Sequence, residues 1–209
     1  MRFNQGDSVM TVDGKEAGHI ERVVIDPRTN EITHLVVRRG LLQKQDKVVP
    51  ITVVTAGLDG QLSVHVRSDD LELLPDYEEE QHVMTDNLEE GEPPSAVFLS
   101  PPYPGGVPGF ANYGPHYVVK THLNIPDVTV ALKEGAKVIA HDNKEVGHVV
   151  QVLTHNSADQ VTHFLIGKGL LVKEHRLIPV GWVDRLSNDE VYLAIDSGTV
   201  ERLPVVETA

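Results

Sequence analysis

Short runs of β-branched and aromatic residues recur along the chain, and turn dipeptides or prolines bound them. The runs "GHIERVVID" and "EITHLVVRR" are joined by "PRTN", in which proline pre-sets the backbone for a tight turn. "DSVMTV", "KVVPI" and "DGQLSVHV" follow the same pattern at close spacing, and almost no stretch has a helical period. The pattern predicts an all-β fold made of small closed or nearly closed barrels.

The same pattern of strands and turns occurs twice. Residues 6–78 align on residues 135–207 without a gap, and the motif "DGKEAGHI" at 13–20 returns as "DNKEVGHV" at 142–149. Gly14 and Asn143 share the first turn position, which suits residues that tolerate a positive φ. We therefore predict a tandem duplication with pseudo-two-fold symmetry. Repeat A spans residues 1–78, a long linker spans 79–128, and repeat B spans 129–207.

Each repeat resembles the PRC-barrel domains. The resemblance rests on "DGKEAGHIERVVIDPRTNEITHLVVRRG" followed by "VVPI", and on "DNKEVGHVVQVLTHNSADQVTHFLIGKG" followed by "LIPVGWV". Members of that family include the cytoplasmic domain of the photosynthetic reaction-centre H subunit and the C-terminal domain of the bacterial ribosome maturation factor. The resemblance implies an adaptor that binds protein or ribonucleoprotein partners. Without the membrane helix of the first or the N-terminal domain of the second, the chain looks more like the free-standing tandem PRC-barrel proteins of bacteria.

Charge and composition narrow the classes of partner. The 18 Lys and Arg residues stand against 31 Asp and Glu, a net charge of −13 that repels nucleic-acid phosphates. The chain has no cysteine, which excludes disulfides, thiolate nucleophiles and Cys-ligated zinc. It shows no apolar signal segment at the N-terminus and no long apolar run. We expect a soluble, cytoplasmic protein.

Candidate partner contacts come from one basic cluster and from the linker. The basic cluster consists of Arg38, Arg39, Lys44 and Lys47. It would contact RNA phosphate or an acidic protein surface, or it protects an edge strand beside the apolar "GLL". Repeat B keeps a thinner version in Lys168, Lys173, His175 and Arg176.

The linker is the most acidic segment for its length, and it holds half of the aromatic residues. Its prolines between residues 101 and 108 suggest a polyproline-type recognition segment that docks on a partner. Alternatively, its aromatic residues pack onto the barrels, or the segment is disordered. The candidate contacts in the linker are Tyr103, Phe110 and Tyr113.

The eleven histidines raise the question of a metal site. His19 and His34 have equivalents in His148 and His163. Antiparallel pairing about "PRTN" sets Asp26 opposite Glu31, His19 near Arg38 and His34 near Val23. The two histidines of one repeat are then too far apart to share a metal ion. A site formed between the repeats stays open.

No catalytic, cofactor-binding or metal-binding residue is predicted. The chain contains none of the motifs H-E-x-x-H, G-x-S-x-G, G-x-G-x-x-G and G-x-x-x-x-G-K-[ST]. We therefore expect a protein-binding or assembly adaptor rather than an enzyme, with a protein as partner. A homodimer would suit its small cores. The alternatives are a ribosome- or RNA-associated factor, which the net charge disfavours, and a histidine-based sensor of a metal or small ligand.

Overall fold

A computed structural model describes residues 2–4, 6–40, 45–56, 61–84, 97–98, 117–133, 135–155, 159–169 and 174–206. The chain divides into two compact units, one made of residues 1–77 and 125–209 and the other of residues 78–124. Within the described residues, almost every element is a strand, and the one α-helix is α1 (Ser197–Glu201). The all-β prediction is confirmed. No described helix has the length and apolar character needed to span a bilayer.

The two repeats build the same ladder of strands. In repeat A the order is β5-β4-β3-β2-β7-β6, and in repeat B it is β15-β14-β13-β12-β17-β16. The pairs β2–β7 and β12–β17 are parallel, and the other pairs along each ladder are antiparallel. Repeat A contains β2 (Ser8–Thr11), β3 (Glu16–Asp26), β4 (Glu31–Arg39), β5 (Gln45–Pro50), η1 (Ile51–Val53), β6 (Val54–Ala56), β7 (Leu62–Val64) and η2 (Asp70–Leu73). Repeat B contains β12 (Lys137–Ile139), β13 (Glu145–Thr154), β14 (Val161–Lys168), β15 (Glu174–Pro179), η4 (Val180–Trp182), β16 (Val183–Leu186) and β17 (Glu190–Leu193).

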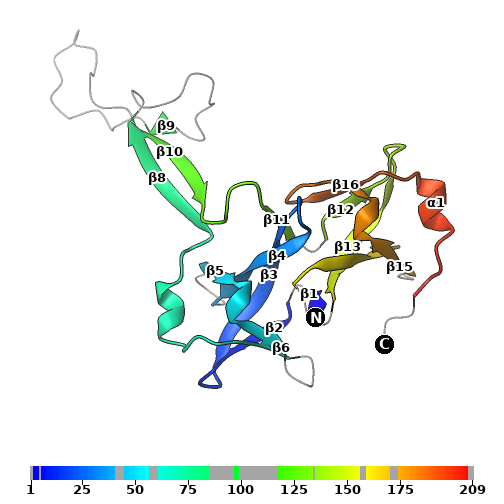
Figure 1. Ribbon diagram of the computed structural model, residues 1–209. Coiled ribbons are helices and arrows are strands. Elements are labelled where there is room, and N and C mark those ends of the chain that lie inside the picture. Colours follow the sequence, from blue (N-terminus) through cyan, green and yellow to red (C-terminus); the bar gives the residue numbers. More distant parts are fainter. Residues whose placement is uncertain are drawn as a thin grey trace, which may run out of the picture. The chain divides into compact units, whose positions relative to one another are not determined.

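The seventh strand of each sheet comes from the other repeat. Strand β1 (Arg2–Asn4) pairs with β13, and β11 (Val130–Lys133) pairs with β3 (Figure 1). Phe3 lies opposite Val152, and Leu132 lies opposite Val23. These two pairs are equivalent in the duplication, so the repeats exchange their first strands reciprocally.

The length of β3 explains why it accepts this extra strand. Its first half pairs with the short strand β2, while β11 covers residues 22–25 on the same edge. An uncovered stretch of that edge would leave backbone N–H and C=O groups without partners. Strand β13 presents the same edge to β1. The exchange therefore completes the hydrogen bonding of the longest strand in each repeat.

A further junction between the repeats lies at the starts of β4 and β14. The backbone N–H of Ile32 donates to the carbonyl of Asp159 at 2.7 Å, and that of Val161 donates to the carbonyl of Asn30 at 2.8 Å. These two bonds are again equivalent in the duplication. Together with the exchanged strands, they join both ladders into one compact unit around a pseudo-two-fold axis.

Two β-bulges in the β3–β4 hairpin shift its register. His19 lies opposite Arg38 and Asp26 opposite Glu31, as predicted, but His34 lies opposite Val24 and not Val23. The extra residues are Glu21 on β3 and Thr33 on β4, so the two shifts cancel and only the segment between them is displaced. Repeat B has matching bulges between β13 and β14. The threonine hydroxyl in each second bulge donates to a backbone carbonyl across the hairpin.

The second compact unit is a small sheet in the order β8-β10-β9. It consists of β8 (Glu78–Met84), β9 (Val97–Phe98) and β10 (Tyr117–Leu123). Strands β8 and β10 pair antiparallel along their whole length, with Glu78 opposite Leu123. The division of the chain at residues 78 and 128 stays a prediction.

Candidate functional site

The duplicated "DGKEAGHI" motif places the same three side chains together in each repeat. The Asp13 carboxylate accepts hydrogen bonds from the Ser68 backbone N–H at 3.0 Å and from the Ser68 hydroxyl at 2.8 Å. The Asp142 carboxylate accepts the same pair from Ser197, at 3.1 and 2.7 Å. Lys15 lies 3.5 Å from Asp13, and its equivalent in repeat B lies 3.0 Å from Asp142. We call each set an Asp–Lys–Ser clasp.

The electrostatics of the clasp favour a structural role. The Ser197 hydroxyl and then Lys144 lower the pKa of Asp142 to about 2. The pKa of Asp13 is also lowered, mainly by the Thr11 side chain and then by Ser68. Hydrogen bonding to Asp142 raises the pKa of Lys144, so its ammonium stays protonated and cannot take a proton from the serine. The clasps fasten the C-terminal segment of each repeat to the turn before β3 or β13.

The glycine of the same motif allows two strands to approach closely. Gly18 has φ +137°, and a Cβ there would lie 2.2 Å from the carbonyl oxygen of Arg38. Gly147 has φ +150°, and its Cβ would lie 2.6 Å from the carbonyl oxygen of Gly167. Only glycine meets both the backbone conformation and the spacing. This explains why the glycine is identical in both repeats.

The predicted basic cluster is divided between different roles. Arg38 donates to both carboxylate oxygens of Asp46, at 2.8 and 2.7 Å, and its third nitrogen lies 2.9 Å from Glu21. Lys47 is 6% exposed, and its ammonium donates to the carbonyls of Glu72 and Leu74. Both cations are therefore engaged within the repeat and are poorly placed to contact phosphate. Arg39 is half-buried and forms no ion pair with the described residues.

Four predicted contacts lie outside the described residues: Lys44, Tyr103, Phe110 and Tyr113. Their roles stay predictions. In the interpretation of the basic cluster, the partners of Arg38 were missed. Ser68 and Ser197 were also missed, although they are identical in the aligned repeats and that identity was a usable signal.

The histidines singled out by the duplication lie in different surroundings. The His19 side chain is 53% exposed and lies 3.7 Å from Glu16. Burial lowers the pKa of His34, whose Nδ1 is buried without a hydrogen-bond partner among the described atoms. Within the described ranges, no group of three or more His, Asp or Glu side chains could hold a metal ion.

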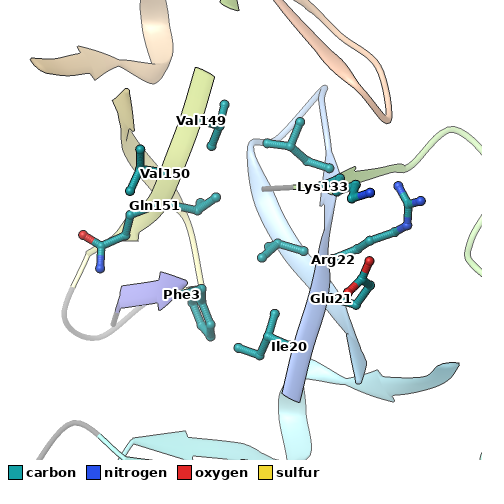
Figure 2. A pocket seen from close by; sticks show the side chains of 11 residues that line it. Phe3, Ile20, Glu21, Arg22, Lys133, Val149, Val150 and Gln151 are labelled. Atoms are coloured by element: carbon teal, nitrogen blue, oxygen red, sulfur yellow. The ribbon is translucent and has the colours of Figure 1, made fainter. Parts of the chain in front are cut away.

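A small cavity lies where the exchanged strands meet β3 and β13 (Figure 2). Its walls come from equivalent positions of the repeats, such as Ile20 and Val149, and Phe3 closes one side. Its volume is about 10 Å³, which is room for one water molecule at most. The cavity is a packing feature and not a substrate site.

An open surface hollow in repeat B is lined by Lys137 and residues 187–190. Its polar groups serve the turn that forms it. The Ser187 hydroxyl donates to the carbonyl of Glu190, and the Asn188 side chain accepts from the backbone of Ala131. These hydrogen bonds hold the turn and the adjoining strand β11 in place, so they do not indicate a site for a bound molecule.

The strand order and the glycine-bearing motif together point to one family, and a family model agrees. Residues 5–78 match the model described as PRC-barrel domain. Repeat A is a PRC-barrel domain. Repeat B has the same ladder order as this PRC-barrel and the same pair of bulges. No curated protein matches the chain. The PRC-barrel assignment points to a small non-catalytic domain.

Proposed function

We propose that this PRC-barrel protein is a non-catalytic adaptor that binds another protein. The observation that carries the proposal is the reciprocal strand exchange. Because each ladder contains a strand from the other repeat, the two repeats hold a fixed relation to each other. A partner can then meet two surfaces at once without the entropic cost of ordering two independent domains.

The chemistry of the described surfaces supports this proposal over the alternatives. Arg38 and Lys47 are engaged by carboxylates and carbonyls, which weakens the case for an RNA-associated factor. The cavity at the exchanged strands is too small for a metabolite, so it offers no support for a small-ligand sensor at that place. Arg39 and the linker residues Tyr103, Phe110 and Tyr113 remain the proposed contacts.

The test is affinity capture from a lysate of the source organism, with the full chain compared with a variant that lacks residues 98–117. We expect the full chain to enrich a specific protein and the deletion to reduce that enrichment at least tenfold. That protein is then purified, and its dissociation constant is measured for the full chain and for Arg39→Ala. Circular dichroism of each variant verifies that the barrels are intact.

Two outcomes would overturn the adaptor proposal. The first is that no protein is enriched above the level seen with an unrelated bait. The second is that the only bound material is RNA, with an affinity that falls steeply with salt concentration. The second outcome would support the ribosome-associated alternative instead.

A further inference from the structure

The sheet of repeat A carries a buried apolar row on the face that points away from its core. Leu35 and Val37 of β4 belong to the hydrophobic core, so Val36 between them projects from the other, outer face. Val36 lies opposite Arg22 on β3 and opposite Val48 on β5, and these three side chains form one row on the outer face. Val36 and Val48 are nevertheless fully buried, so another group must cover the row.

The ring of Tyr77 covers this row. The backbone N–H of Tyr77 donates to the carbonyl of Asp46 at 2.6 Å, so the residue lies beside β5. The guanidinium carbon of Arg22 on β3 nonetheless lies 5.5 Å from the centre of the ring. Because β4 lies between β3 and β5, the ring and the guanidinium meet above β4. Tyr77 is 3% exposed, and its cation–π contact with Arg22 holds the ring over the valines.

Repeat B has the equivalent face without this cover. Its C-terminal segment follows β15 in the same register, since the backbone N–H of Val206 donates to the carbonyl of His175 at 2.8 Å. However, Val206 stands at the position of Tyr77, and Gln151 stands at the position of Arg22. Repeat B therefore supplies neither the aromatic ring nor the cation that holds it.

Leucine side chains make up most of the equivalent face of repeat B. Leu165 lies opposite Gln151 and opposite Leu177, and Leu153 lies in the next row. Leu153, Leu177 and Val206 are half-buried, whereas their equivalents in repeat A are buried, namely Val24, Val48 and Tyr77. The longer leucine side chains thus replace only part of the missing cover. We call the surface formed by Leu153, Leu165, Leu177 and Val206 the leucine face.

We propose that the leucine face binds an aromatic side chain of a partner protein, in the place that Tyr77 takes in repeat A. The duplication indicates this occupant, because the equivalent surface of the same chain already seats an aromatic ring. The side-chain amide of Gln151, at the position of Arg22, can hydrogen-bond a tyrosine hydroxyl. Aromatic side chains are also frequent anchors at protein interfaces. This inference rests on the proposed adaptor function and names the surface that holds the partner.

Methyl NMR of the full chain tests the leucine face, with N-acetyl-tyrosinamide as the probe and N-acetyl-leucinamide as the aliphatic comparison. We expect saturable shifts of the Leu153, Leu177 and Val206 methyl signals, with a dissociation constant on the order of 1 mM for so small a ligand. The leucine amide should bind about threefold more weakly than the tyrosine amide.

Two variants and one control locate the binding. Leu177→Gln should weaken binding of the tyrosine amide about fivefold, because it removes apolar area from the leucine face. Val206→Tyr/Gln151→Arg rebuilds the arrangement of repeat A and should weaken binding at least about fivefold, because the chain's own ring then occupies the face. The control is Val12→Gln, at a 54% exposed valine between β2 and β3, which should bind as the wild type does. Thermal unfolding of each variant verifies that its fold is intact.

Three NMR results would overturn the inference. They are the absence of saturable shifts at the leucine face, equal binding by Leu177→Gln and the wild type, and binding of the leucine amide as tight as that of the tyrosine amide. Shifts that follow protein concentration without any probe would also overturn it, because a second copy of the chain would then be the occupant.

Affinity capture with Leu177→Gln separates this inference from the adaptor function. If the wild-type chain captures no protein, the adaptor function fails and the inference falls with it. If both chains capture the same protein equally well, the adaptor function stands and only the leucine face is wrong. Capture that Leu177→Gln loses, together with the expected NMR shifts, supports both.

Discussion

The burial of Phe3 gives the strongest stability prediction. A three-residue strand at a chain terminus is ordinarily frayed, and truncating its side chain then costs almost nothing. Here Phe3 is 1% exposed and packs within the hydrophobic core as part of the strand that completes repeat B. Removing a fully buried phenylalanine side chain costs about 3–5 kcal/mol. We expect Phe3→Ala to lower the free energy of unfolding by about 3 kcal/mol, since a short strand can relax.

Urea unfolding measures this loss, and the single tryptophan makes the measurement specific. Trp182 lies in repeat B, so its fluorescence reports that repeat while circular dichroism reports both. If strand exchange couples the repeats, the two probes give coincident transitions in the wild type. With a slope of about 3 kcal/mol per molar urea, the midpoint of Phe3→Ala falls by about 1 M.

The exposed neighbour Arg2 supplies the control for this experiment. Arg2→Ala should leave stability within about 0.5 kcal/mol of the wild type. Leu132→Ala, the equivalent change in β11, should cost about 3 kcal/mol. If Phe3→Ala costs no more than Arg2→Ala, strand β1 does not contribute to the stability of repeat B.

Three further predictions concern the motif and the ion pairs. Gly147→Ala should lower the free energy of unfolding by about 3 kcal/mol, because its Cβ would meet a backbone oxygen. Gly14→Ala has open space around it and should cost about 1 kcal/mol. Equal costs in urea unfolding would contradict the close approach of the strands at Gly147. The pKa of Asp142 is about 2, below its ordinary value, so the stability it adds is present above pH 4 and is lost as the pH falls through 2. Asp142→Asn should be less stable at neutral pH and should flatten the stability profile between pH 4 and 2, and a profile parallel to the wild type would count against the clasp. Arg38→Met should lower the free energy of unfolding by about 2 kcal/mol, because the carboxylates of Asp46 and Glu21 lose their cation. A variant in which Arg38, Asp46 and Glu21 are all replaced by the equivalent residues of repeat B should recover most of that loss in thermal unfolding.

The strands and much of the pairing were predictable from the sequence. Turn dipeptides and β-branched runs mark β3 and β4, and the turn between them sets His19 opposite Arg38. The register of His34 was missed because the prediction counted residues one to one from the turn, whereas a bulge sets two residues of one strand opposite one residue of the other. Paired bulges are recognised only when both strands are seen together.

The strand exchange was hidden from the sequence for a different reason. Because the repeats are related, the edge of either barrel offers the same kind of backbone hydrogen-bonding groups to "RFN" and to "VALK". A first strand that folded back onto its own repeat would satisfy the same backbone groups, and bury the same side chains, as one that crosses to the other repeat. The partners of Arg38 were missed for a related reason. Charge spacing along one strand does not show that Asp46 lies beside Arg38 on the next.

Strand β1 crosses to repeat B, and a pair of introduced cysteines tests this crossing. Asn4 lies opposite Gln151, and the equivalent position in its own repeat is Arg22. Because the chain has no natural cysteine, any disulfide reports the engineered pair. Paired residues on antiparallel strands have Cα atoms about 4.5–5.5 Å apart, within disulfide range.

We expect mild oxidation of Asn4→Cys/Gln151→Cys to give an intramolecular disulfide in a protein that runs as a monomer on a non-reducing gel. Asn4→Cys/Arg22→Cys should stay reduced under the same conditions. Cross-linking of the second pair in place of the first would place β1 on its own repeat and would contradict the reciprocal exchange.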